Sequence, residues 1–256
     1  MTGDITCDGI LNQKLVLYQY KMGYRVAVDS ILVGAMVDLS AKNILDLGAG
    51  VGAVSLVAQY WNRLAQYHAV ENNIDYFHLL KKNLLKANLS LRRGKKMTTH
   101  HCDIKTFADN PHHREKFCQV LCNPPFDNID DTTPPPDGLK RSAFVFQSGD
   151  NMLDWWQAGL AVLRLGGRLS FITRFDMKKT IIDFFSQYKG LLTMQSVVAN
   201  DRTIRWLVDF KKLPNNMGDV ITPPDFILQT TKKNGTHYTP KADAILAGEA
   251  YHHFPF

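Results

Sequence analysis

A glycine-rich stretch constrains the fold of this chain more than any other feature. Residues 46–52 read DLGAGVG; they overlap the end of the apolar run NILDL at 43–47 and open a segment with helical periodicity. Glycines at positions 48, 50 and 52 allow a tight turn and let the backbone approach a ligand closely. This order of strand, turn and helix is typical of nucleotide-binding α/β folds, so it predicts a ligand site at the end of a buried strand.

Strand-like and helix-like segments alternate along most of the chain. Apolar runs and periodicity predict strands over 43–47, 67–71, 97–101, 117–122, 167–173, 191–198 and 204–211. Helices are predicted over 52–61, 75–88, 151–165 and 177–187. Alternation followed by a late pair of strands predicts an α/β fold with a doubly wound, mostly parallel seven-stranded sheet and an antiparallel edge strand.

The size and composition suit one domain. The chain has 256 residues, of which 45% are hydrophobic and 21% charged, so it can bury a core without disulfides or metal ions. We expect a single domain over 1–256, with a core at 41–212 between an N-terminal segment, 1–40, and a C-terminal tail, 213–256. The Pro-rich stretch at 127–140 is predicted to be a long functional loop.

Several classes of protein are not expected. No apolar run is long enough to cross a membrane, and the N-terminus lacks the pattern of a signal peptide, so we expect a cytoplasmic protein. The histidines and the four cysteines show no metal-ligand spacing, and no metal is expected.

The net charge of +6 is unevenly distributed. No acidic residue occurs between Asp75 and Asp103, whereas this interval contains Lys81, Lys82, Lys86, Arg92, Arg93, Lys95 and Lys96. Such a patch favours binding to the phosphates of a nucleic acid. The alternative is a solvated helix face that continues into a basic loop.

Acidic residues follow the predicted strands. Asp46 precedes the glycines, where its carboxylate can receive an ammonium group and would repel a pyrophosphate. Glu71, at the end of the second strand, can accept both ribose hydroxyls of a bound adenosine. Asp103, after the third strand, can accept from the amino group of its adenine. A surface carboxylate and a local turn residue are the alternatives for Glu71 and Asp103.

The most specific motif is Asn123-Pro124-Pro125-Phe126, after the fourth strand. Two prolines fix the backbone, so the Asn123 side chain and the Pro124 carbonyl are predicted to act as rigid acceptors for one NH₂ group. An adenine or amide nitrogen has its lone pair tied up in conjugation, and two acceptors orient it and stabilise the charge that develops on transfer. Phe126 offers a ring on which a flipped-out base can stack. Trp155 and Trp156, which are neighbours in the predicted helix at 151–165, are expected in the core rather than as a platform for base stacking.

With DLGAGVG, Glu71, Asp103 and NPPF in this order, the chain resembles the class I S-adenosylmethionine-dependent methyltransferases of the N6-adenine and N5-glutamine group, whose fold is Rossmann-like. Residues 23–37, GYRVAVDSILVGAMV, resemble a segment of the bacterial tRNA1(Val) (adenine-N6)-methyltransferases. Residues 227–246 are similar to the closing segment of that family.

The resemblance implies S-adenosylmethionine as the cofactor and a tRNA adenine as the target. It implies a target site made by Asn123, Pro124, Pro125 and Phe126. It also implies cofactor contacts from Asp46, Gly48, Ala49, Gly50, Glu71, Asn72, Asp103, Ile104 and Asn123, and from a covering segment that includes Tyr24, Arg25 and Asp29. After the NPPF motif the stretch LKRSAFVFQSG at 139–149 departs from the pattern of relatives, which leaves the RNA itself open.

Three other functions remain open from the sequence. A protein glutamine-N5 methyltransferase would use the same motif, although only 45 residues precede Asp46, which leaves little room for the helical substrate-binding region of that group. A non-catalytic RNA- or nucleotide-binding module would keep the fold without the activity. The pattern G-x-G-x-x-A at residues 48–53 also permits a nicotinamide-dependent oxidoreductase.

Overall fold

The structure is a computed structural model. It describes residues 4–22, 25–90, 97–125, 151–215, 220–232 and 235–252, without the side chains of 88–90 and 232. The predicted loop at 127–140, the aromatic residues Tyr24 and Phe126, and the basic residues at 92–96 therefore lie outside the described residues.

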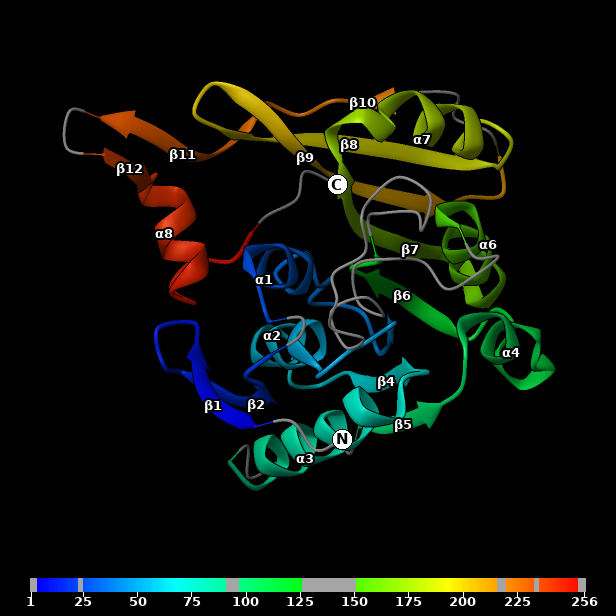
Figure 1. Cartoon of the computed structure of the whole chain (residues 1–256). Helices are drawn as coiled ribbons and strands as arrows, with labels where there is room; N and C mark the ends of the chain where they lie inside the picture. Colours follow the sequence, from blue (N-terminus) through cyan, green and yellow to red (C-terminus); the bar gives the residue numbers. More distant parts are fainter. Residues whose placement is uncertain are drawn as a thin grey trace.

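One ten-stranded sheet forms the centre of the molecule (Figure 1). Its strands, in spatial order, are β12 (Gly235–Tyr238), β11 (Phe226–Lys232), β8 (Gly190–Ala199), β9 (Arg202–Lys212), β7 (Leu163–Arg174), β6 (Phe117–Cys122), β3 (Asn43–Leu47), β4 (Gln66–Glu71) and β5 (Thr98–His101), with β10 (Val220–Ile221) beside β8. Strands β5, β4, β3, β6 and β7 run parallel to one another. Strand β9 runs antiparallel to both of its neighbours, β7 and β8. The doubly wound, mostly parallel sheet is confirmed.

Helices cover both faces of this sheet. One face packs against α4 (Ile104–Asp109), α6 (Met152–Val162) and α7 (Lys178–Phe185). The other face packs against α1 (Val28–Gly34), α2 (Ala53–Trp61), α3 (Ile74–Ser90) and α8 (Pro240–Leu246). In β3, Leu45 belongs to the first core and Ile44 to the second, because successive side chains of a strand point to opposite faces. Short 3-10 helices occur at Pro111–His113 and Phe175–Met177.

An N-terminal hairpin that periodicity did not predict lies outside the main sheet. It consists of β1 (Ile5–Ile10) and β2 (Leu15–Tyr20), which pair antiparallel. The buried side chain of Asn83, on α3, accepts from the backbone N–H of Tyr18 at 2.6 Å and donates to its carbonyl at 2.8 Å. A single amide thus continues the strand pairing and fixes the hairpin to α3.

Two details differ from the sequence prediction. Helix α6 ends at Val162, three residues before the predicted end at 165, and β7 begins at Leu163. The antiparallel strand β9 lies inside the sheet, because β11 of the C-terminal tail pairs with β8 and extends the sheet beyond the predicted seven strands. Tail strands of this kind lack clear alternation of polar and apolar residues, so periodicity missed them.

Two kinds of feature are absent from the described residues: a membrane-spanning helix and a cluster of metal ligands. No helix within these ranges is long and apolar enough to span a membrane. Among the same residues, no group of three or more His, Cys, Asp or Glu side chains is arranged to hold a metal ion.

Candidate active site

The glycine turn connects β3 to α2. Gly48, Gly50 and Gly52 all have positive φ angles, of 73°, 56° and 93°, a conformation that L side chains rarely adopt. A Cβ atom built on Gly50 would meet no described atom within 4 Å. The backbone is therefore open to an approaching ligand on this side, while the N–H of Ala49 is bonded to the Val70 carbonyl at 2.8 Å.

Asp46 lies beneath this turn and is only 1% exposed. Its Oδ2 accepts from the backbone N–H of Ser55 at 2.9 Å and from the Ser55 hydroxyl at 2.6 Å, which ties β3 to the first turn of α2. Its Oδ1 is buried and has no hydrogen-bond partner among the described residues. Burial raises the pKa of Asp46 to about 7, against the opposing effect of the Ser55 hydrogen bonds.

Glu71 ends β4 beside the same turn. Its two carboxylate oxygens accept from the backbone N–H groups of Gly50 and Asn73, each at 2.7 Å. Burial raises its pKa although these hydrogen bonds act in the opposite direction. The carboxylate is thus held at the turn, and each oxygen keeps a further lone pair for a ligand hydroxyl. The neighbouring Asn72 is exposed.

Asp103 is the N-cap of α4. Its carboxylate accepts from the backbone N–H of Thr106 at 2.9 Å and from the Thr106 hydroxyl at 2.6 Å, and these bonds lower its pKa. Asp103 is exposed, whereas the following Ile104 is buried in the core. Asp103 therefore acts as a local capping residue, and its carboxylate is still accessible from the solvent.

Asn123 immediately follows β6, next to the glycine turn. Cys122 pairs with Leu47 on the neighbouring strand. The residues that follow them, Asn123 and Gly48, therefore begin at strand ends that lie about 5 Å apart. The Asn123 Nδ2 donates to the hydroxyl of Ser30, on α1, at 3.0 Å. Pro124 is buried and Pro125 partly buried. Phe126 lies outside the described residues.

The strand register brings the predicted site residues to one edge of the sheet. Leu47 pairs with both Cys122 and Val70, and Glu71 pairs with His101. The segments that follow β3, β4, β5 and β6 therefore lie side by side in the order Asp103, Glu71, glycine turn and Asn123. In an open parallel sheet, this carboxyl edge is where ligands bind.

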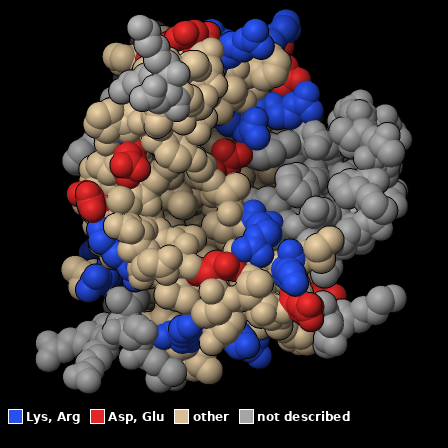
Figure 2. All heavy atoms as spheres, turned by 60° about the vertical axis from the view of Figure 1, so that its left-hand side comes forward, with Lys and Arg blue, Asp and Glu red and all other residues tan. Residues whose placement is uncertain are grey.

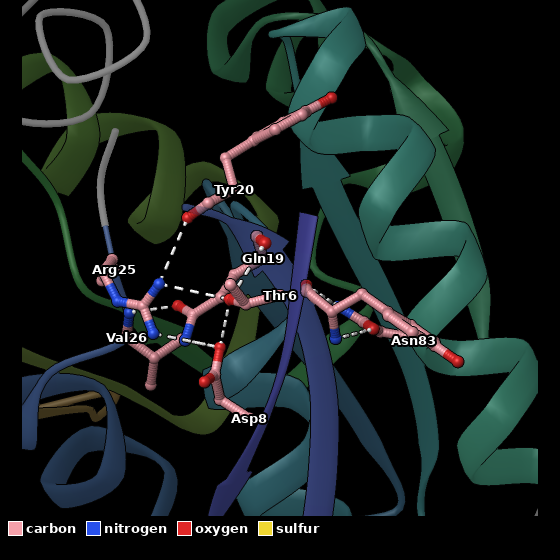
Figure 3. Close-up of polar contacts among 8 residues, drawn as sticks. Thr6, Asp8, Gln19, Tyr20, Arg25, Val26 and Asn83 are labelled. Carbon is pink, nitrogen blue, oxygen red and sulfur yellow. Dashed lines mark hydrogen bonds and ion pairs between the residues drawn. The ribbon is translucent and has the colours of Figure 1, made fainter. Parts of the chain in front are cut away.

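Two residues of the predicted covering segment make polar contacts with other parts of the protein. The Arg25 guanidinium forms an ion pair with Asp8 at 3.0 Å and donates to the Thr6 hydroxyl at 3.2 Å, which fixes it to the hairpin (Figure 3). Asp29 accepts from Nε of Arg205, on β9, at 3.0 Å. The described contacts thus give Arg25 and Asp29 roles in anchoring α1, and their predicted contact with the cofactor stays a prediction.

Trp155, which the sequence predicts in the core, packs against the glycine turn. A Cβ atom at Gly48 would lie 2.3 Å from Cη2 of Trp155, so the indole packs directly on the glycine turn. Trp156 is 1% exposed in the core, while Trp155 is only partly buried. Trp155 also packs against the core that contains Trp156, so its ring lies between that core and the glycine turn.

Comparison with known proteins bears on this edge of the sheet. A family model described as "Methyltransferase small domain" matches residues 27–135, which include β3 to β6 and all the strand ends above. Residues 27–135 are therefore similar to a methyltransferase small domain. Its glycine turn, Glu71 and Asn123 all fall within the matched residues.

Curated relatives extend the similarity beyond this small domain. A Flavobacteriaceae bacterium (strain 3519-10) protein named tRNA1(Val) (adenine(37)-N6)-methyltransferase is 36% identical over 115 residues, which are 44% of this chain and 46% of that protein. A Haemophilus influenzae (strain PittEE) protein of the same name is 28% identical over 81% of this chain and 86% of its own length. The chain spans about half the length of the curated relatives that it matches at 30% identity or more.

Solved structures share the fold of the methyltransferase small domain and its flanking elements. A predicted O-methyltransferase from Agrobacterium tumefaciens superposes with a TM-score of 0.66 at 22% identity, over 87% of this chain and 97% of that one. A 16S rRNA N2 G1207 methyltransferase from T. Thermophilus, solved with AdoMet and guanosine, superposes with a TM-score of 0.54 at 19% identity, over 82% of this chain and 50% of that one. The chain thus has the Rossmann-like α/β fold of these solved structures, as the sequence motifs predict.

Proposed function

We propose that this chain transfers a methyl group from S-adenosylmethionine to the N6 amine of an adenine in a tRNA. One observation carries the proposal: the Asn-Pro-Pro stretch follows β6 directly beside the glycine turn of the neighbouring strand β3. The names of the curated relatives support the same substrate and the same nitrogen.

The residues at the glycine turn fit S-adenosylmethionine. A buried carboxylate oxygen of Asp46 lacks a hydrogen-bond partner among the described residues, and a cationic cofactor would stabilise its ionised form. The open side of Gly50 leaves room for close approach, and Glu71 keeps acceptor capacity for ribose hydroxyls. Asp46, Gly48, Gly50, Glu71 and Asp103 would hold the cofactor, which supplies a methyl group carried on a sulfonium sulfur.

The chain's own contribution to the reaction is to orient the target amine. Asn123 Oδ1 and the Pro124 carbonyl would accept the two amine protons, so that the nitrogen lone pair is directed at the methyl carbon. As the N–C bond forms and the C–S bond breaks, these acceptors stabilise positive charge on the nitrogen. The products are the methylated amine, S-adenosylhomocysteine and one proton, which the acidic cation releases to solvent.

The described surface gives the RNA part of the proposal limited support. On the face seen in Figure 2, the described Lys and Arg side chains form separate groups with Asp and Glu among them. On α3, the ammonium groups of Lys82 and Lys86 lie 3.8 and 4.6 Å from the ring centroid of Tyr18. These two lysines place positive charge on α3 beside the hairpin.

The test is methyl transfer to defined RNA. The purified chain is incubated with labelled S-adenosylmethionine and fractionated tRNA, and the nucleosides are identified by mass spectrometry. We expect N6-methyladenosine in one tRNA fraction, and none with the Asn123→Ala variant. Absence of this nucleoside from every fraction would contradict the proposal, and label in the glutamine of a release factor would replace it with protein methylation.

A further inference from the structure

An exposed aromatic residue lies at the same edge of the sheet as the Asn-Pro-Pro stretch. Phe175 directly follows β7, which ends at Arg174, and it begins the short 3-10 helix that leads to α7. It is 56% exposed. Within the described ranges, the other aromatic residue among the exposed large hydrophobic residues is Tyr238, on β12. Phe175 is therefore accessible to a partner at the proposed ligand-binding edge.

The strand register places Phe175 close to the proposed target site. Cys122 of β6 pairs with Phe171 of β7. Asn123 therefore follows at the level of Ile172, one strand away. Phe175 comes three residues after Ile172, which is about 10 Å further along the strand direction. A nucleotide next to a base held at Asn123 can thus reach the turn that carries Phe175.

The turn that carries Phe175 is held by the neighbouring strand β9. Trp206 Nε1 donates to the Phe175 carbonyl at 2.8 Å, and Trp206 itself pairs with Thr173 of β7 in the sheet. The Arg174 guanidinium and the Asp176 carboxylate form an ion pair at 2.8 Å across the turn. These contacts fix the backbone around an exposed ring, so little conformational freedom is lost when a flat ligand stacks on it.

Positive charge lies beside this turn. Lys178, the first residue of α7, is exposed, and its ammonium group lies 5.1 Å from the centroid of the Trp206 ring. Asp176 balances the charge of Arg174, whereas contact with an uncharged ring leaves the full charge of Lys178 at the surface. A phosphate group complements this charge, which favours a nucleic acid as the occupant of the surface.

We propose that Phe175 stacks on the base of a nucleotide that flanks the target adenine, and that Lys178 contacts a phosphate of the same strand. This inference rests on the proposed function. Proteins that recognise single-stranded RNA commonly stack its bases on aromatic side chains, and a base that is flipped out leaves its neighbours without a stacking partner. Phe175 supplies that partner at the rim of the site.

The test measures binding of tRNA to the whole chain with S-adenosylhomocysteine present, so that no turnover occurs. Loss of one base-stacking contact should raise Kd for tRNA about tenfold in Phe175→Ala. Phe175→Tyr keeps a ring and should stay within about twofold of the parent, whereas Phe175→Leu keeps only apolar area and should resemble Phe175→Ala. Parental affinity of Phe175→Ala, or equal affinity of Phe175→Leu and Phe175→Tyr, would overturn the inference.

Two matched controls show whether the contacts are specific to this surface. Tyr238→Ala removes the exposed aromatic residue on β12, at the other end of the sheet, and should leave Kd unchanged. Lys178→Gln should reduce the slope of log K against log salt by about 1. Lys179→Gln, whose ammonium group pairs with Asp183, should not. An equal loss of affinity in Tyr238→Ala, or equal slopes in the two lysine variants, would contradict the proposed surface.

Methylation of tRNA by the parent is assayed in parallel, because it reports on the proposed function alone. A parent that methylates no tRNA, yet binds it about tenfold more tightly than Phe175→Ala does, would refute the proposed function and leave the stacking surface in place. A parent that methylates tRNA, with equally tight binding by Phe175→Ala, would refute the stacking surface and leave the proposed function in place.

Discussion

Asp46 and Asn123 occupy the ends of neighbouring strands but have different environments. Asp46 is buried below the glycine turn and bonded to Ser55, whereas Asn123 is partly accessible and bonded to Ser30. The first is therefore suited to hold the cofactor and the second to hold the target amine. This division of roles can be tested with single substitutions.

We predict that Asp46→Ala loses cofactor binding, because it removes the buried carboxylate below the turn. Asn123→Ala should bind S-adenosylmethionine within about twofold of the parent yet lower kcat by about 100-fold or more. Isothermal titration and single-turnover assays measure the two quantities. Near-normal turnover of Asn123→Ala would show that its oxygen does not hold the amine.

Trp155 provides a second prediction at the residue scale. Because its indole packs on Gly48, binding of the cofactor at the turn should alter its fluorescence. We expect this change to disappear in Trp155→Phe. It should persist in the control Trp206→Phe, which replaces a partly buried tryptophan on β9. Trp155→Leu should weaken cofactor affinity about fivefold through lost contact area. An unaltered fluorescence change in Trp155→Phe would remove Trp155 from the site.

At the scale of elements, α3 connects the hairpin to the glycine turn. The same Asn83 amide that pairs with Tyr18 also donates to the Val51 carbonyl, in the glycine turn, at 2.9 Å. Three backbone groups thus depend on one fully buried side chain. The turn is held from below by this helix as well as by its own glycines.

We expect Asn83→Leu to lower the free energy of unfolding by roughly 2–4 kcal/mol, since buried backbone groups lose their partners. It should also weaken cofactor binding, because Val51 is no longer fixed. Asn62→Leu is the matched control: Asn62 is 4% exposed and donates to the carbonyls of Asp38 and Ala41, away from the turn. Urea unfolding and calorimetry should show destabilisation in both variants but weaker binding only in Asn83→Leu.

Strands β4 and β5 carry a histidine pair that makes stability depend on pH. His68 Nδ1 and His100 Nε2 are 3.0 Å apart, and burial lowers the pKa of each to about 4. Between pH 6.5 and pH 4 the unfolded chain therefore binds more protons than the folded one, so stability falls as the pH falls through this window. The full stability of the folded protein with both histidines neutral is therefore present only above about pH 6.5.

We predict that the free energy of unfolding drops by roughly 2 kcal/mol between pH 7 and pH 5 through this pair, with allowance for screening at the partly exposed His100. Replacement of both residues by asparagine should flatten that part of the pH profile, measured by urea unfolding at each pH. A profile with the parental slope would show that these histidines are not responsible.

For the molecule as a whole, the two ends of the described chain meet over α2. Lys14, at the start of β2, donates to the carbonyls of Ala247 and Gly248 at the end of α8, at 2.8 and 3.2 Å. The Tyr60 hydroxyl, on α2, donates to the Gly248 carbonyl at 3.1 Å. The hairpin and the tail thus meet beside α2. Both lie on the same side of the molecule (Figure 1).

Binding of RNA belongs to this largest scale, because it depends on the field of many charges. Neutralising Lys95 and Lys96 together should weaken binding of tRNA and reduce the slope of log K against log salt by about 1–2, if both contact phosphates. Lys179→Gln, whose ammonium pairs with Asp183 on α7, is the control and should leave the slope unchanged. Filter binding between 50 and 200 mM salt, a range in which the phosphate term is large, would measure it.

Local sequence signals were sufficient to predict the α/β pattern of residues 43–122. Alternation of apolar segments, the glycines at 48–52 and the acids after the strands predicted the parallel sheet and its ligand-binding edge, because these signals depend only on neighbouring residues. The strands of the hairpin and of the tail were not predicted, since short strands without clear alternation carry little local signal.

The packing of helices against the sheet determines which distant side chains support that edge. Ser30 meets Asn123, Trp155 meets Gly48, and Asn83 meets Val51. Each pair joins segments that are far apart in the chain, and each depends on how helices and sheet pack together. No periodicity specifies which of many polar or aromatic residues a packed interface brings into contact, because that choice is made by shape and burial over the whole core.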